Sequence, residues 1–250
     1  MTRALSLPGA LLSLVLWTML TVGGGIAQAG GESQLSELAE QGIVYAIPAA
    51  ALLLILLYRS NLASLGLTRV ETLRPALLPS LVVALLLLLS ILNGLPATSV
   101  LLILVVNSCA VGLSEELMFR GVIFGALRER LTLSRAVLLS ALAFGAIHSL
   151  NALITGEIVG ALLQSCIAVG MGLWAVSLRL RTGSIYPSIV LHALWDLALL
   201  IVLTHGTTSG LSGATSLIAI IGAIALGIWG WRGATRFARA SELAGERFVA

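Results

Sequence analysis

SEELMFR, residues 114–120, places two adjacent glutamates and an arginine inside an apolar run that extends from Ser99 to Leu127. The whole chain of 250 residues contains eleven acidic residues, so two neighbouring ones within an apolar run are unusual. An ionised carboxylate in hydrocarbon costs roughly 2.5–3.5 kcal/mol on insertion scales. Charged residues at such depth usually face the interior of a helix bundle, so this stretch predicts a buried functional site in a membrane-spanning helix.

The composition is typical of a protein with several membrane-spanning helices. Hydrophobic residues make up 58% and charged residues 10% of the chain, against roughly 25% charged residues in a soluble domain. The mean hydropathy is +1.07. The chain has no lysine, and its arginines other than Arg120 are scattered between apolar runs, so membrane topology rather than nucleic-acid binding explains the net charge of +3. We therefore expect an all-α, polytopic integral membrane protein.

Eight apolar segments approach the length that is needed to cross roughly 30 Å of hydrocarbon. The sequence thus predicts about eight transmembrane helices. The segments are Leu5–Ile26, Ile43–Tyr58, Ala76–Leu92, Ser99–Leu127, Ala136–Leu150, Ile158–Leu178, Ile185–Leu203 and Ala214–Trp231.

Arginines alternate along the chain in a way that predicts its orientation. They precede the first segment and occupy the second, fourth and sixth connections and the tail, whereas the odd-numbered connections hold no arginine. Positive charge stays on the cytoplasmic side of a membrane, so both termini are predicted to be cytoplasmic. The absence of lysine, with abundant alanine, leucine and glycine, favours a bacterial plasma membrane as the location.

The first segment also fits a signal peptide. Arg3 precedes its apolar core, and an AQA motif at residues 27–29 precedes Gly30, as at a cleavage site. The apolar stretch is long for a signal peptide, so a retained helix is the preferred interpretation. Cleavage would leave seven transmembrane helices with the same orientation.

The acidic stretch divides into two faces of one helix. Glu116 and Arg120 are four residues apart and can form an ion pair on one face. Glu115 lies about 100° around the helix axis, so it can face a cavity. A plain buried ion pair that locks two helices would explain the same residues.

Two further apolar segments contribute histidines. His148 follows Phe144 by one turn, and His192 precedes Asp196, the sole aspartate of the chain, by one turn. A carboxylate beside an imidazole can fix its tautomer and orientation. At about 1.5 Å per residue, Glu115, His148 and His192 lie at depths within about 6 Å of one another. A packing histidine and a histidine–aspartate strut are the structural alternatives.

Three kinds of chemistry fit these side chains. Glu115 can act as general base for a water that attacks a peptide carbonyl, with His148 helping to hold the water and His192 donating to the oxyanion. The same residues could instead bind zinc, although the HExxH spacing is absent. A proton relay in a transporter is the third reading.

The three segments together resemble the CAAX protease and bacteriocin-processing family (CPBP, or Abi) of intramembrane proteases. The family pattern is E-E-x-x-x-R, then F-x-x-x-H, then H-x-x-x-N or H-x-x-x-D. It is similar to Glu115–Arg120, Phe144–His148 and His192–Asp196, which follow in the same order. The resemblance covers roughly Ser99 to Leu203.

That resemblance implies an endopeptidase inside the bilayer. It implies that Glu115 and His148 activate water and that His192 and Asp196 stabilise the oxyanion, with Glu116 and Arg120 in support. Many members carry asparagine where this chain has Asp196. An ionised aspartate cannot donate to an oxyanion, so Asp196 is expected to act through His192 or to be protonated.

The expected partners are a membrane-associated peptide or protein substrate and the lipid bilayer, without nucleic acid. No cofactor is expected, and zinc is kept as the alternative. The chain is expected to divide into three parts. Residues 1–98 hold helices 1–3, with 1–29 as the possible signal peptide, and residues 99–204 hold the catalytic core of helices 4–7. Residues 205–250 hold helix 8 and a basic cytoplasmic tail. An inactive membrane scaffold of the same fold and a proton-coupled transporter are the competing functions, but the paired broken helices of transporters are not evident.

Overall fold

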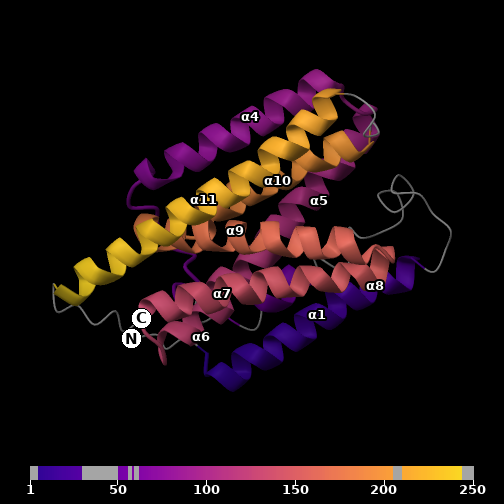
Figure 1. Ribbon diagram of the computed structural model, residues 1–250. Helices are drawn as coiled ribbons and strands as arrows, with labels where there is room; N and C mark the ends of the chain where they lie inside the picture. The colour runs from indigo at the N-terminus through magenta and orange to yellow at the C-terminus, as the bar shows by residue number, and fades with distance from the viewer. Residues whose placement is uncertain (1–4, 30–49, 56–57, 59–61, 205–209, 244–250) are drawn as a thin grey trace.

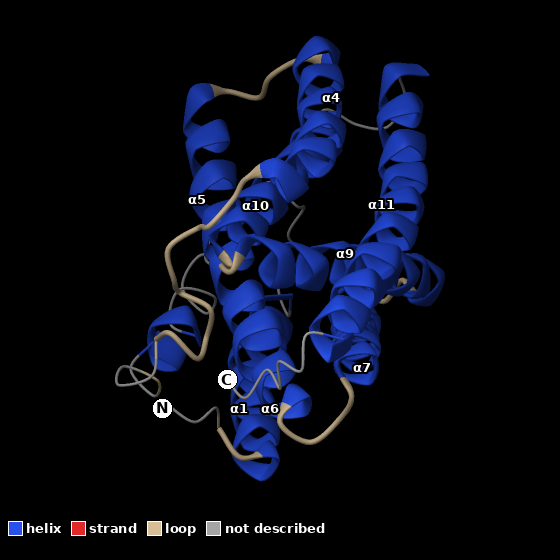
Figure 2. Cartoon of the chain, turned by 90° about the vertical axis from the view of Figure 1, so that its left-hand side faces the viewer, coloured by secondary structure: helices blue, strands red, loops and turns tan. Residues whose placement is uncertain are grey.

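A computed structural model describes residues 5–29, 50–55, 58, 62–204 and 210–243. All regular structure in this part of the chain is helical, as Figure 2 shows, which confirms the all-α prediction. Most of the predicted segment Ile43–Tyr58 lies outside the described residues, and residues 50–55, which are described, are helical. The number of eight helices and the cytoplasmic termini therefore stay predictions.

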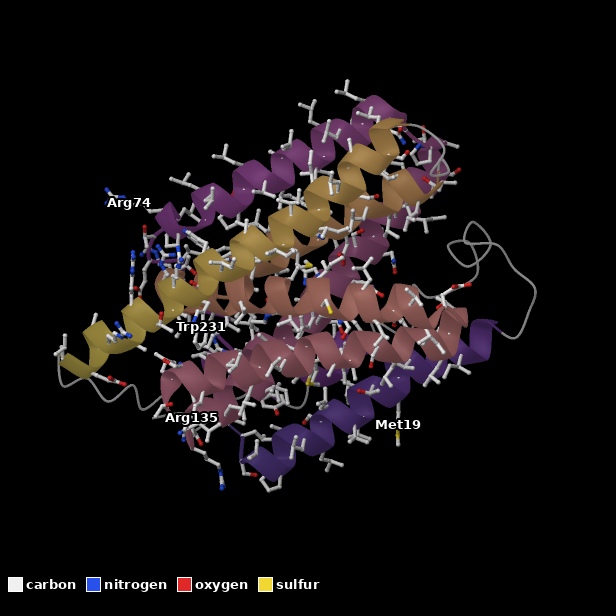
Figure 3. All side chains as sticks on the ribbon, in the orientation of Figure 1. Met19, Arg74, Arg135 and Trp231 are labelled. Atoms are coloured by element: carbon white, nitrogen blue, oxygen red, sulfur yellow. The ribbon has the colours of Figure 1, made fainter. Side chains whose placement is uncertain are left out.

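Seven helices among the described residues are long and apolar enough to cross a membrane, so the chain is an integral membrane protein. Large apolar side chains such as Leu12, Met19 and Leu81 are more than half exposed, as lipid-facing residues are. Figure 3 shows Met19 pointing away from the bundle. The long helices are α1 (Leu7–Ala29), α4 (Leu77–Asn93), α5 (Thr98–Glu116), α7 (Leu133–His148), α9 (Ile158–Thr182), α10 (Tyr186–Thr204) and α11 (Gly210–Leu243).

Short helical segments continue α5 and α7, and another precedes α4. The π-helix η2 (Leu117–Ile123) and then α6 (Phe124–Arg128) continue α5, and a 3₁₀ turn, η1 (Arg74–Ala76), leads into α4. The predicted segment Ala136–Leu150 is α7, which ends at His148 and continues through η3 (Ser149–Asn151) and α8 (Ala152–Thr155).

The helix α9 lies at the centre of the arrangement. It packs against α7 on one side and α11 on the other. In Figure 1 the helices α4, α10 and α11 lie above it, whereas α1 and α7 lie below it. The helix α10 packs against both α5 and α4, so α5 and α10 form the second wall of the bundle.

Glycines allow α9 and α11 to approach closely. A Cβ atom at Gly230 would lie 2.5 Å from the Cα of Trp174, and one at Gly227 would lie 2.9 Å from the Cα of Gly170. Side chains at these positions would therefore push the two backbones apart. Close packing through small residues is the usual way in which membrane helices associate, because lipid gives them no hydrophobic driving force toward one another.

The helix α1 is packed into the bundle. Trp17 is 4% exposed, and its Nε1 donates a hydrogen bond of 2.7 Å to the hydroxyl of Ser114 on α5. Its ring meets Phe119 edge to face, with 5.7 Å between the centroids. The first helix therefore covers the acidic stretch directly.

Arginines gather at one end of the bundle. Figure 3 shows Arg74 before α4, Arg135 at the start of α7 and Trp231 in α11 all at this end. In Figure 1 the start of α1 and the end of α11 lie toward it as well. This clustering is what the alternating arginines lead one to expect if that end faces one side of the membrane.

Candidate active site

Glu116 is the buried hub of the site. Its side chain is 0% exposed, and its Oε1 lies 3.0 Å from Nη1 of Arg120, which is 1% exposed. The same oxygen accepts a hydrogen bond of 2.9 Å from Nδ1 of His192 on α10. The guanidinium of Arg120 also lies over the ring of Phe144, 4.0 Å from its centroid. Each charge in this cluster thus has an oppositely charged or aromatic partner.

The π-helix η2 follows Glu116 immediately and is entirely buried. Wider helical turns leave backbone carbonyls without their usual intrahelical partners. Here the hydroxyl of Ser140 donates to the carbonyl of Phe119 at 2.9 Å. Nη1 of the buried Arg179 donates to the carbonyl of Gly121 at 3.3 Å. These outside donors stabilise the irregular turn on which Arg120 lies. The sequence alone does not predict this π-helix.

Glu115 points away from the ion pair, and its side chain is 17% exposed. Its Oε2 lies 3.7 Å from Nε2 of His192 and 3.9 Å from Nε2 of His148. Both separations are too long for direct hydrogen bonds. They suit a bridging atom such as a water oxygen, which could contact the carboxylate and a ring nitrogen together.

His148 is oriented by its own helix. Its Nδ1 lies 2.8 Å from the carbonyl oxygen of Phe144, one turn earlier. A carbonyl only accepts hydrogen bonds, so Nδ1 carries a hydrogen, and Nε2 faces Glu115. The Phe144 ring packs edge to face against the same imidazole, with 4.7 Å between centroids. The F-x-x-x-H spacing therefore sets both the position and the tautomer of His148.

His192 lies among three carboxylates. Glu116 binds Nδ1, while Nε2 lies 3.5 Å from Oδ2 of Asp196 and 3.7 Å from Glu115. The sequence suggested Asp196 as the group that orients this ring, but the nearest carboxylate is that of Glu116, on a different helix. The close packing of α5 against α10 explains the difference, because a Cβ at Gly112 would lie 2.9 Å from the carbonyl oxygen of Ile189.

All four predicted catalytic residues line one cavity of about 430 Å³. Glu115 comes from α5, His148 from α7, and His192 and Asp196 from α10, while α9 supplies much of the apolar wall. A smaller cavity of about 190 Å³ lies on the α1 side and shares Glu115, His148 and Asn151 with the larger one. The carboxylate and the imidazole thus lie between two hollow spaces.

Asn151 and Trp17 belong to this site but were not among the predicted site residues. Asn151 lines both cavities and donates a hydrogen bond of 2.8 Å from Nδ2 to Oε1 of Gln164 on α9. A polar amide close after His148 in an apolar run was the available signal. Trp17 lines the smaller cavity, and nothing in the sequence connects it to a residue nearly a hundred positions away.

No group of three or more His, Cys, Asp and Glu side chains is arranged to hold a metal ion, as far as the described residues extend. The two cysteines, Cys109 and Cys166, do not line either cavity.

Residues 97–198 match the family model described as Type II CAAX prenyl endopeptidase Rce1-like. This segment of the chain is therefore similar to an Rce1-like domain. This domain begins before α5 and ends within α10, so it includes every residue of the acidic stretch and both histidines. The Rce1-like family is one of membrane proteases of the CPBP group, as the sequence resemblance indicated. No curated protein and no solved structure shows significant similarity to the chain.

Proposed function

We propose that this protein is an intramembrane endopeptidase that hydrolyses a peptide bond of a membrane-associated protein or peptide. The observation that supports the proposal most strongly is the meeting of Glu115, His148 and His192 at one cavity. The Nε2 atoms of both histidines lie within 4 Å of Oε2 of Glu115. Each of the three comes from a different membrane-length helix, an arrangement that packing alone does not require.

Glu115 is the general base in this proposal. A water between its carboxylate and Nε2 of His148 gives up a proton to Glu115 as its oxygen attacks the scissile carbonyl carbon. The proton then passes to the amide nitrogen as the C–N bond breaks, so that an amine and a carboxylic acid leave. The long separation of 3.9 Å between the two groups provides the space for this water.

His192 stabilises the oxyanion that forms during the attack. Its Nδ1 is held by Glu116, so Nε2 is the nitrogen that can donate to the developing charge. A ring that donates from both nitrogens is positively charged, and the carboxylates of Glu116 and Asp196 balance that charge. Asp196 therefore acts on the oxyanion through His192, whereas Glu116 and Arg120 position the ring.

The membrane orientation and the division of the chain form the second part of the proposal. We propose that the arginine-rich end of the bundle faces the cytoplasm, with both chain termini there. Residues 99–204 are proposed as the catalytic core, with 1–98 and 205–250 as flanking helices. The packing of Trp17 against Ser114 and Phe119 supports α1 as a structural part of that arrangement.

Peptides released from membranes test the proposal. Membranes that contain the wild type or Glu115→Ala are incubated, and the released peptides are compared by quantitative mass spectrometry. Glu157→Ala is the matched control, because Glu157 is exposed and lies outside the cavities. We expect peptides that appear with the wild type and the control but not with Glu115→Ala. Identical peptide sets from all three would leave a scaffold or a transporter as the function.

A chelator in the same assay tests the role of metal. Preincubation with 1,10-phenanthroline, followed by its removal, should leave the release of Glu115-dependent peptides unchanged. Loss of release that added zinc restores would show that the carboxylate and the imidazoles act as metal ligands.

A further inference from the structure

A further cavity lies away from the proposed active site. It has a volume of about 570 Å³ and lies between the last turns of α9 and the second half of α11. Three arginines line it: Arg181 from α9, and Arg232 and Arg236 from α11. No acidic residue of the described chain lines it. None of the residues of the active-site cavities takes part in it, so the proposed proteolysis does not account for it.

The arginines are arranged to present their charge to the cavity. Arg232 and Arg236 are four residues apart, so they share one face of α11. The guanidinium of Arg181 lies over the ring of Trp229, 4.8 Å from its centroid. A Cβ atom at Gly233 would lie 3.0 Å from Nη1 of Arg181, so a residue without a side chain leaves that space to the guanidinium. None of these guanidinium groups forms an ion pair with a carboxylate of the described residues.

The cavity lies at the depth of lipid headgroups. The apolar part of α11, from Gly210 to Trp231, is roughly 33 Å long at about 1.5 Å per residue, which matches the roughly 30 Å of hydrocarbon. Arg232 and Arg236 follow directly, so they lie where this helix leaves the hydrocarbon. Trp229 and Trp231 lie at the same level, as aromatic residues do at membrane interfaces. Figure 3 places Trp231 toward the end of the bundle where Arg74 and Arg135 lie.

We propose that this cavity binds the phosphate headgroup of an anionic phospholipid. Guanidinium groups bind phosphate oxygens in a bidentate manner, and three of them converge here without competing carboxylates. The ring of Trp229 and the apolar side chain of Ile228 on the same cavity wall suit the glycerol and the upper acyl chains. Basic pockets between transmembrane helices on the cytoplasmic side commonly bind such headgroups.

Lipid binding to the purified full-length protein tests the proposal. Native mass spectrometry in a neutral detergent measures how much phosphatidylglycerol or phosphatidylcholine stays bound. The variant is the double substitution Arg232→Gln and Arg236→Gln. The matched control is Arg239→Gln, because Arg239 is exposed on the same helix but does not line the cavity.

We expect the wild type to retain phosphatidylglycerol in preference to phosphatidylcholine. The double variant should bind phosphatidylglycerol on the order of 10- to 30-fold more weakly, at the usual contribution of an arginine near a lipid surface. Arg239→Gln should change it by no more than roughly twofold. Equal weakening in the variant and the control would show a diffuse charged surface and overturn the proposal.

Inorganic phosphate separates a lipid site from a site for a free anion. Millimolar phosphate should not displace phosphatidylglycerol, whereas displacement would identify a soluble anion as the ligand and refute the lipid proposal. Arg181→Gln, on the other helix, gives a second test should the double variant fold poorly, and it should also weaken binding. The measurement does not involve cleavage, so its outcome is independent of the proposed proteolysis.

Discussion

Replacement of Glu116 by glutamine should destabilise the fold strongly, whereas the same replacement of its neighbour Glu115 should not. Glu116 is fully buried, and its Oε1 contacts Arg120 at 3.0 Å and His192 at 2.9 Å. Loss of its charge leaves the guanidinium of Arg120, only 1% exposed, without its carboxylate. Removing one partner of a buried ion pair costs about 3–5 kcal/mol.

Glu115 differs although it is adjacent in sequence. Its carboxylate is 17% exposed, and its nearest ring nitrogens are 3.7 and 3.9 Å away. Contacts of that length contribute about 1 kcal/mol or less. The two substitutions remove the same charge from the same helix, so each is the control for the other.

Thermal unfolding of the purified protein in detergent measures the difference. For a chain of this size, 1 kcal/mol corresponds to roughly 2–4 °C in Tm. Glu116→Gln should therefore lower Tm by roughly 6–20 °C, and Glu115→Gln by roughly 4 °C at most. Adding Arg120→Met to Glu116→Gln should recover part of the loss, because the unpaired charge is gone. Equal Tm values for the two single variants would refute the division of the pair into a structural and a reactive carboxylate.

Three further predictions follow from other contacts. Asp196→Asn should keep measurable cleavage and Asp196→Ala should not, because only asparagine retains a polar group 3.5 Å from His192. An equal loss of released peptides in both variants would show that the negative charge itself is needed. Gly230→Ala should lower Tm, since its Cβ would lie 2.5 Å from Trp174, at an expected cost of about 1–3 kcal/mol. Gly213→Ala on the same helix has open space around it and should not lower Tm. Trp17→Phe removes the hydrogen bond to Ser114 and should lower the free energy of unfolding by about 1 kcal/mol. An unchanged Tm would mean that this hydrogen bond does not anchor α1 to α5.

The helices could be predicted from the sequence because hydrocarbon imposes a length and a composition on any segment that crosses it. The run Ser99–Leu127 corresponds to Thr98–Arg128 in the structure, and Ile185–Leu203 corresponds to α10. The last helix is longer than predicted, because α11 continues past Trp231 to Leu243. Residues that leave the hydrocarbon no longer need to be apolar, so hydropathy alone does not mark the end of such a helix.

The site could be predicted only as far as local spacing determines it. Intervals of four residues place Glu116 with Arg120 and Phe144 with His148, and these contacts lie within one helix. The hydrogen bond from His192 to Glu116 joins two helices, and its existence depends on how closely α5 packs against α10. The π-helix η2 and the contact of Trp17 with Ser114 depend on tertiary packing in the same way.

In the proposed mechanism, Glu115 and His148 act as one unit on a single water. The most direct measurement is the cleavage rate of a peptide that carries a site identified among the released peptides, with Glu115→Gln, His148→Asn and the double variant. Each single substitution should lower the rate by roughly 10²–10⁴-fold, and the double variant should be no slower than the slower single variant, because residues that act together are not additive. Single losses that multiply in the double variant, or full activity in either single variant, would show that the two residues do not act together on one water.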